Sequence, residues 1–213
     1  MRLALIGGTG FVGAALLNEA LQRGHQVTAL QRDPSRLPAR PGVDVRQADV
    51  LHAAQVSDAV AGHDAVLSAY NAGWQNPDLY EEFLRGSRAI AEGTRAAGVQ
   101  RLLVVGGAGS LYVAPGVQLV DTPDFPAEWK QGALAAREAL NLLRQETELA
   151  WTFVSPPVFL DPGAKRGGFR LGGDEVLMDA GQPARVTVGD LAVAVLDEVE
   201  RPAHVRRRFT LGY

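Results

Sequence analysis

Four glycines near the amino terminus are the residues best suited to chemistry with a phosphate ligand. Gly7, Gly8, Gly10 and Gly13 follow the apolar residues 3–6 and precede apolar side chains at helical spacing, so strand, tight turn and helix come in order. Such a turn lets backbone amides approach a pyrophosphate without interference from Cβ atoms, and the helix start supplies unpaired N–H groups. An ordinary strand-to-helix turn is the alternative. The placement between a strand and a helix favours dinucleotide binding.

Arg32 is the second candidate, because it directly follows the end of a second expected strand at 26–30 and lies 19 residues beyond Gly13. In a dinucleotide-binding fold this strand end lies beside the adenosine ribose, where a carboxylate favours NAD and an arginine favours the 2′-phosphate of NADP. Gln31 stands where the acidic residue is expected. We therefore predict NADP(H) as the preferred cofactor. NAD(H) is the alternative, since Arg32 could be a solvated loop residue and Asp33 could accept from a ribose hydroxyl instead of capping the next turn.

The ends of further strands carry residues that could contact the nucleotide. Asp49 follows the alternating segment 42–47, and its carboxylate could accept from the adenine amino group while Val50 packs on the ring. Capping of a helix at 53–61 is an equally good interpretation of Asp49. Open α/β sheets bind ligands at the carboxyl ends of their strands. At those ends we expect cofactor contacts from Ser68, Ala69, Tyr70, Gly106, Gly107 and Ala108.

Ser110 and Tyr112 are the candidates for a polar group that assists a reaction. They follow a second glycine cluster, just after a strand predicted over Arg101–Val105. The Ser110 hydroxyl could orient a substrate, or it could cap the loop. The Tyr112 side chain could act as an acid, although packing or gating is the commoner role of such a residue. We name both as catalytic candidates.

The elements that must position these residues alternate between strands and helices. Beyond the segments above, the predicted elements are strands at 64–68, 151–154 and 209–211 and helices at 76–97 and 190–200. The longer helix is expected to begin at Asn76, as N-cap, and Pro77. This alternation predicts an α/β fold with a Rossmann-type, doubly wound parallel sheet. We expect residues 1–213 to form one domain, with a C-terminal part from about 155 to 213 that shapes the substrate side.

Composition and charge narrow the function classes. The chain of 213 residues has a net charge of −3 and no cysteine, which excludes disulfides, thiolate metal sites and cysteine nucleophiles. The four histidines lack metal-ligand spacing, so no metal is predicted. The charge gives no reason to expect nucleic acid or a membrane surface as partner, and the arginine triplet 206–208 is interpreted as the solvated edge of the last strand.

The amino-terminal apolar run is not expected to be a targeting segment. It is broken by the glycines and lacks a clear small-residue cleavage site. No apolar run in the chain has the length of a bilayer crossing. We therefore expect a cytoplasmic monomer or homodimer.

Five stretches together resemble the atypical short-chain dehydrogenases/reductases: GGTGFVG, LQRDPSRL, VVGGAGSLYV, WTFVSPP and the closing VTVGDLAVAVLDEVE with RRRFTLGY. The chain is similar to the bacterial NAD(P)H-binding, NADH-flavin-reductase-like proteins, a group related to biliverdin reductase B and to the NmrA-like regulators. The similarity spans essentially the whole chain. It implies a Rossmann-type fold that binds NAD(P)H, with flavins or quinone-like compounds as electron acceptors.

The resemblance also implies roles for single residues. It matches the diphosphate loop to Gly7, Thr9, Gly10, Phe11 and Val12, the adenosine phosphate to Arg32, the adenine contact to Asp49 and Val50, the nicotinamide to Gly107 and Ser110, and the carboxamide side of that ring to Pro156 and Val158.

The chain departs from the larger superfamily in its catalytic pair. That superfamily reduces carbonyls with a tyrosine and a lysine four residues later, and the lysine lowers the pKa of the tyrosine. Here the two lysines, Lys130 and Lys165, are preceded at that spacing by Pro126 and Asp161. Carbonyl reduction through such a pair is therefore not expected.

Reduction of a flavin or quinone needs fewer protein groups. Stacking and alignment of two planar rings can supply much of the catalysis, and solvent can supply the proton. The leading hypothesis is an NADPH-dependent reductase of such small-molecule acceptors. A non-catalytic NAD(P)-binding redox sensor is the alternative. A sugar epimerase or dehydratase is disfavoured because it also needs the tyrosine.

Overall fold

Eight strands form one sheet, and the computed structural model describes residues 1–213 in full. In chain order these strands are β1 (Arg2–Ile6), β2 (Gln26–Gln31), β3 (Val43–Gln47), β4 (Ala65–Ser68), β5 (Arg101–Val105), β8 (Ala150–Ser155), β10 (Arg170–Gly172) and β14 (Arg207–Gly212). Their order in space is β10-β14-β8-β5-β4-β1-β2-β3, and only β10 runs antiparallel to its neighbour. This confirms the predicted doubly wound parallel sheet.

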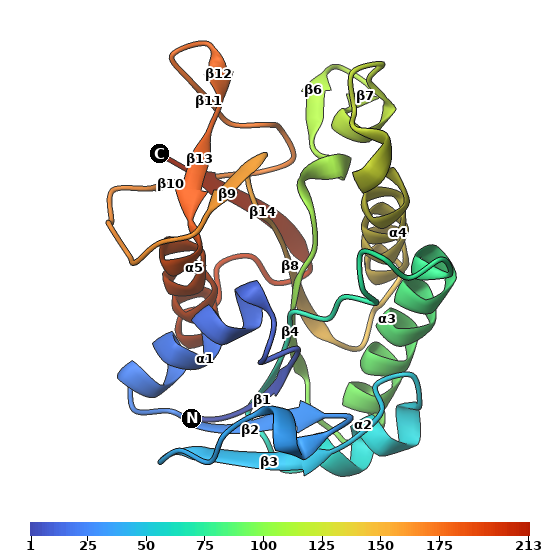
Figure 1. Cartoon of the computed structure of the whole chain (residues 1–213), viewed down its shortest axis with the longest axis vertical. Helices are drawn as coiled ribbons and strands as arrows, with labels where there is room; N and C mark the ends of the chain where they lie inside the picture. The colour runs from blue at the N-terminus through green and yellow to red at the C-terminus, as the bar shows by residue number, and fades with distance from the viewer.

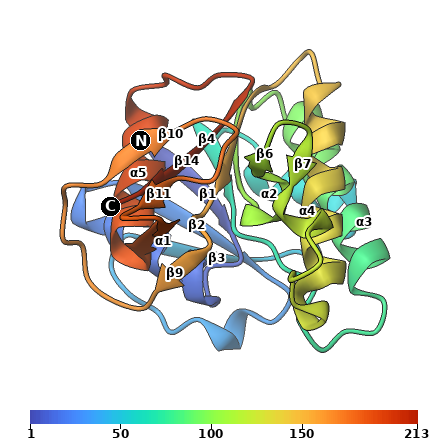
Figure 2. The same cartoon turned by 90° about the horizontal axis from the view of Figure 1, so that it is seen from above.

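Helices cover both faces of the sheet (Figures 1 and 2). Two of them, α1 (Phe11–Gln22) and α5 (Val188–Glu200), pack on one face. The opposite face carries α2 (Ala53–Val60), α3 (Leu79–Ala96) and α4 (Ala127–Arg144). Three short 3₁₀ turns complete the helical elements, namely η1 (Pro34–Arg36), η2 (Ala108–Ser110) and η3 (Leu119–Asp121). None of the helices combines the length and the apolar character that a membrane crossing needs.

The central strands are apolar on both sides because both sides are buried. Leu3 and Leu5 of β1 pack into the cluster with α1 and α5, whereas Ala4 and Ile6 pack into the cluster with α2 and α3. A strand covered on both faces reads as a continuous apolar run, which is what residues 3–6 show. The amino-terminal sequence therefore places the first glycine turn at the centre of the sheet, between β2 and β4.

Short strand pairs rise from the carboxyl edge of the sheet (Figure 1). They are the hairpin β6 (Tyr112–Ala114) with β7 (Val117–Gln118), the hairpin β11 (Met178–Asp179) with β12 (Gln182–Pro183), and the parallel pair β9 (Phe159–Asp161) with β13 (Arg185–Thr187). β6 follows η2 after the end of β5, and β9 follows the end of β8. These segments therefore stand beside the strand ends where the sequence predicts ligand binding.

Two local predictions are wrong. α3 begins at Leu79, not at Asn76, because the Asn76 side chain accepts from the Asp78 N–H at 2.9 Å and closes a separate turn first. The arginine triplet is a solvated edge only in part: Arg206 and Arg207 are exposed as predicted, but the prediction is wrong for Arg208, which is buried.

Candidate functional site

The first glycine turn is packed backbone against backbone. Gly7 has φ of +81°, a conformation that favours glycine, and a Cβ there would lie 2.4 Å from the Ala69 carbonyl oxygen at the end of β4. A Cβ on Gly13 would lie 2.0 Å from the Gly7 oxygen. Glycine is therefore needed at both positions to bring β1, α1 and β4 this close together.

The amino end of α1 offers unpaired amide groups. Its N-cap is Gly10, which has no side chain to cap the helix, and the N–H groups of Phe11 and Val12 have no acceptor in the protein. Thr9, Gly10 and Phe11 are exposed. Free N–H groups and the positive end of the helix dipole suit an anion such as a diphosphate. The residues present therefore fit the phosphate part of a dinucleotide.

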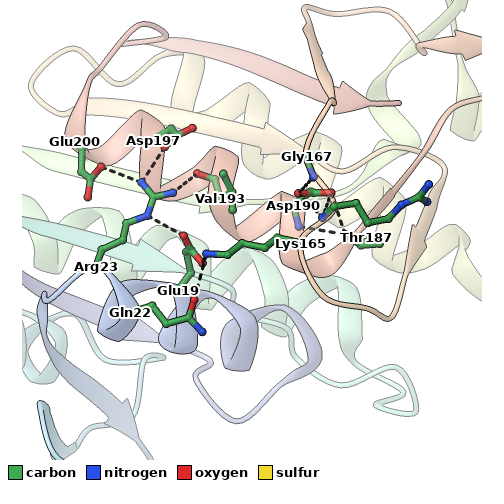
Figure 3. Close-up of polar contacts among 11 residues, drawn as sticks. Glu19, Gln22, Arg23, Lys165, Gly167, Thr187, Asp190, Val193, Asp197 and Glu200 are labelled. Carbon is green, nitrogen blue, oxygen red and sulfur yellow. Dashed lines mark hydrogen bonds and ion pairs between the residues drawn. The ribbon is translucent and has the colours of Figure 1, made fainter.

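Charged side chains hold α1 against α5 (Figure 3). Arg23 donates to Asp197 at 2.8 Å, to Glu200 at 2.9 Å and to Glu19 at 2.9 Å, and Lys165 Nζ donates to the second Glu19 oxygen at 3.0 Å. Burial alone would raise the pKa of Glu19, but the hydrogen bonds from Arg23 and Lys165 outweigh it and hold that pKa below its ordinary value. This network fixes the helix that begins at the glycine turn.

The end of β2 has the polarity predicted for a phosphate site. Arg32 is exposed and its guanidinium makes no hydrogen bond or ion pair. Gln31 beside it is 8% exposed, and its Nε2 has no hydrogen-bond partner. Asp33 accepts from the Ser35 N–H at 3.0 Å and from its hydroxyl at 2.7 Å, so it caps η1. The strand end thus presents one exposed, unpaired cation, Arg32, while the Asp33 carboxylate accepts hydrogen bonds within the turn.

The ends of β3 and β4 lie close to Arg32. Asp49 Oδ1 accepts from the Leu51 N–H at 3.0 Å, an arrangement that stabilises the turn before α2 without capping the helix itself. Val50 is buried. Burial raises the pKa of Tyr70 to about 12, with a smaller rise from Glu82 that the charge of Arg32 opposes. The charge of Arg32 therefore acts on Tyr70, although no hydrogen bond joins the two side chains.

Tyr70 itself is held by packing. Its ring stacks on Phe83 with centroids 5.7 Å apart, and its hydroxyl donates to the Glu82 carbonyl at 3.3 Å. A Cβ on Gly86 would lie 2.5 Å from the Tyr70 ring, so α3 needs a glycine to admit it. Ser68, the last residue of β4, is buried, and Ala69 after it is half-buried. These contacts leave Tyr70 as a fixed wall of the site.

The second glycine cluster opens at Gly107. A Cβ on Gly106 would lie 1.9 Å from Phe153 Cζ, so Gly106 serves packing. A Cβ on Gly107 would meet only Ala136 Cβ, at 3.8 Å. Ala108 next to it is half-buried. Gly107 therefore leaves room for a ligand, whereas Gly106 does not.

Comparison with known proteins agrees with this geometry. A family model described as NAD(P)H-binding matches residues 7–199, from the glycine turn to the end of α5. The chain belongs to this family. The protein YwnB of Bacillus subtilis, which bears no functional name, is 38% identical over 99% of this chain and 98% of its own length.

Solved structures of similar proteins share the fold of this chain over its whole length. A Bacteroides thetaiotaomicron protein, provisionally named an epimerase, has a TM-score of 0.92 and 42% identity, and the match covers 100% of this chain and 96% of that one. A Streptococcus pneumoniae protein, provisionally named an NADH-flavin reductase, has a TM-score of 0.87 and 34% identity with coverage of 100% and 99%. The resemblance to NAD(P)H-binding short-chain dehydrogenase/reductase proteins is confirmed.

One of the two predicted catalytic residues, Ser110, is buried in the interior of the protein. Ser110 is 2% exposed, and its Oγ accepts a hydrogen bond from Arg208 Nη1 at 2.9 Å. This geometry argues against a substrate-orienting role and also against a simple loop cap. Tyr112 is half-buried, and its side chain makes no hydrogen bond. A catalytic role for Tyr112 stays a prediction.

The remaining predicted residues lie at the end of β8. Pro156 is buried and Val158 half-buried, between β8 and β9. Just before them, the buried Ser155 hydroxyl has no hydrogen-bond partner. At the spacing of the superfamily's tyrosine–lysine pair, Pro126 is the N-cap of α4 and Lys130 is exposed. Sequence reasoning missed Asp174 and the contact of Arg208 with Ser110, because these contacts join distant segments and leave no local pattern.

Proposed function

We propose that the protein is an NADPH-dependent reductase of flavin or quinone-type acceptors. Membership of the NAD(P)H-binding family supplies the cofactor class. The observation that carries the choice of NADPH is the end of β2, where Arg32 is exposed and has an unpaired guanidinium. It would bind a 2′-phosphate, whereas the one carboxylate there, Asp33, already accepts two hydrogen bonds from Ser35.

Five residues would hold the phosphates of the cofactor. The N–H groups of Phe11 and Val12 would bind the diphosphate, with Gly7 and Gly10 giving it close access to the backbone. Arg32 would bind the adenosine phosphate. When bound, the reduced nicotinamide supplies a hydride at the carboxyl edge of the sheet.

The protein's contribution to the reaction would be alignment. Gly107 leaves space at the end of β5, and Pro156 and Val158 form the neighbouring wall after β8. No lysine stands beside a tyrosine in this region, and Lys130 is exposed on α4. A site that aligns planar rings and takes its proton from solvent suits a flavin or quinone better than a carbonyl. The name given to the S. pneumoniae protein agrees with this acceptor class.

The test is steady-state oxidation of NADPH with FMN, riboflavin and a quinone, each against a protein-free control. We expect turnover above the uncatalysed rate with at least one of them. The absence of turnover across this panel would contradict the reductase. Tight NADPH binding without turnover would instead favour the redox sensor, for which a protein partner should then be recovered.

A further inference from the structure

A buried arginine connects the last strand to the loop after β5. The Arg208 side chain is 1% exposed, although it lies at the start of β14. Phe209 and Leu211 of the same strand pack into the cluster with α1 and α5, so Arg208 points to the opposite face of the sheet. On that face it lies next to η2, and its buried charge needs hydrogen-bond acceptors there.

The guanidinium divides its donors between two partners. Nε donates to Asp174 Oδ1 at 2.7 Å, and Nη2 also donates to that oxygen and to the Asp174 carbonyl at 3.2 Å. Nη1 donates to Ser110 Oγ at 2.9 Å. Burial lowers the pKa of Arg208, and Asp174 opposes that shift. The planar fork of an arginine is what allows both partners to be bound at once.

Asp174 also reaches the same loop through its backbone. Its carbonyl accepts from the Tyr112 N–H at 2.8 Å, and the Tyr112 carbonyl accepts from the Val176 N–H at 2.9 Å. Arg208, Asp174 and the segment from Ser110 to Tyr112 thus form one closed set of contacts. The loop after β5 is held at its far end by residues from the C-terminal part of the chain.

The two ends of this loop are held by different contacts. Gly106 is fixed by its N–H, which donates to the Val154 carbonyl at 2.9 Å. Gly109 packs closely on α4, where a Cβ would lie 2.7 Å from Ala133 Cβ, whereas a Cβ on Gly107 would meet only Ala136, at 3.8 Å. The path of Gly107 and Ala108 is therefore set by Gly106 on one side and by Gly109 and Ser110 on the other.

We propose that Arg208 is a positioning residue that acts through Ser110 to fix the Gly107–Ala108 backbone at the reacting end of the cofactor. This inference rests on the proposed function, because it takes that backbone as the place where the nicotinamide is aligned. Arg208 touches neither cofactor nor substrate. Adenosine binding depends on Arg32 at another strand end, so a loss at Arg208 changes alignment more than affinity.

The experiment uses three variants: Arg208→Lys, Ser110→Ala and the double variant that carries both changes. Arg207→Lys is the control against which they are compared. Arg207 is the matched control, since it is the neighbouring arginine and its side chain makes no hydrogen bond or ion pair. Hydrogen–deuterium exchange is followed in the peptide that spans residues 106–111. The kcat with FMN and the Kd for NADPH are measured on the same samples.

We expect faster exchange at 106–111 and a fall in kcat of about 10-fold or more for Arg208→Lys and for Ser110→Ala, with little change in the NADPH Kd. The double variant should lose no more than Arg208→Lys alone, because both act through one contact. Arg207→Lys should behave as wild type.

Wild-type exchange and wild-type kcat in folded Arg208→Lys and Ser110→Ala would overturn the proposal, even if their Tm falls. Additive losses in the double variant would also overturn it. If the wild-type protein turns over no acceptor, the reductase function fails by itself. The exchange of residues 106–111, measured with and without NADPH, still decides whether Arg208 holds the loop.

Discussion

Arg208 Nη1 lies 2.9 Å from Ser110 Oγ, although the two residues are 98 positions apart in the chain. Both side chains are buried, so the contact joins β14 to the loop after β5 inside the protein. The serine in the second glycine cluster is therefore part of the framework behind the site. Its hydroxyl holds the loop in place, and Gly107, which is half-buried, is the residue of this cluster that we propose as a ligand contact.

Gly107→Ala separates a ligand contact from a packing contact. An added Cβ would have only Ala136 near it, at 3.8 Å, so we expect stability within about 0.5 kcal/mol of wild type. If the cofactor or acceptor lies against this backbone, turnover should fall sharply. Gly173→Ala is the control, because nothing lies within 4 Å of a Cβ there. Unchanged turnover in Gly107→Ala would remove Gly107 from the site.

Gly7→Ala should lose more stability than Gly24→Ala, although both glycines have φ near +80°. The left-handed conformation costs an alanine about 1 kcal/mol at either position. At Gly7 the Cβ would also lie 2.4 Å from the Ala69 oxygen, whereas nothing lies within 4 Å of it at Gly24. Urea unfolding of both variants measures the difference. Equal losses would mean that β1 and β4 are not packed this closely.

Arg32→Ala should weaken NADPH binding by about 10- to 100-fold, the effect of losing a charge-assisted hydrogen bond to phosphate. NADH binding should change little, because NADH has no 2′-phosphate. Arg36→Ala is the matched control, as Arg36 is an exposed arginine in the neighbouring turn. Calorimetric titration with both nucleotides gives the four affinities. Equal losses for NADPH and NADH would show that Arg32 does not contact the 2′-phosphate.

The strands of the sheet could be predicted from sequence because their signal is local. Residues 3–6 are apolar without interruption, and the structure buries them on both faces. The glycines that follow and Arg32 could be placed for the same reason, since each stands at a fixed distance from a strand end. Such positions depend on chain order and strand length alone.

Other features could not be predicted because they depend on contacts between distant segments. The three arginines at 206–208 look alike in sequence, yet only Arg208 is buried, where its guanidinium donates to Asp174 and Ser110. From the sequence, the carboxylate of Asp33 could either turn inward or cap a helical turn. In the structure it caps the turn, because it accepts a hydrogen bond from the Ser35 hydroxyl. The pattern of a single sequence does not predict which side chain becomes the hydrogen-bond partner of Arg208 or of Asp33.

Acid should destabilise the protein through Glu198. Burial alone would raise the pKa of Glu198, but hydrogen bonds from His204 and Ala203 and the charge of Arg101 hold it below the ordinary value of 4.5. The unfolded chain then takes up the proton more readily than the folded one. The stabilisation is therefore complete above about pH 4.5 and is lost as the pH falls through the folded pKa.

Glu198→Gln tests this at two pH values. At neutral pH it should cost about 3–5 kcal/mol, since it leaves the buried Arg101 without its carboxylate partner at 2.8 Å. The variant should then lose less stability than wild type on acidification. Glu148→Gln, whose exposed carboxylate lies 3.6 Å from Arg95, should cost less than about 1 kcal/mol. A parallel pH dependence in wild type and Glu198→Gln would contradict the assignment.

The account depends most on nucleotide binding at the first glycine turn. Hydrogen–deuterium exchange of the peptide that contains residues 7–13, with and without saturating NADPH, measures this directly. We predict strong protection of the Phe11 and Val12 amides by NADPH, because they have no acceptor in the protein alone. Unchanged exchange at these amides, at an NADPH concentration where calorimetry shows saturation, would place the cofactor elsewhere and contradict the account.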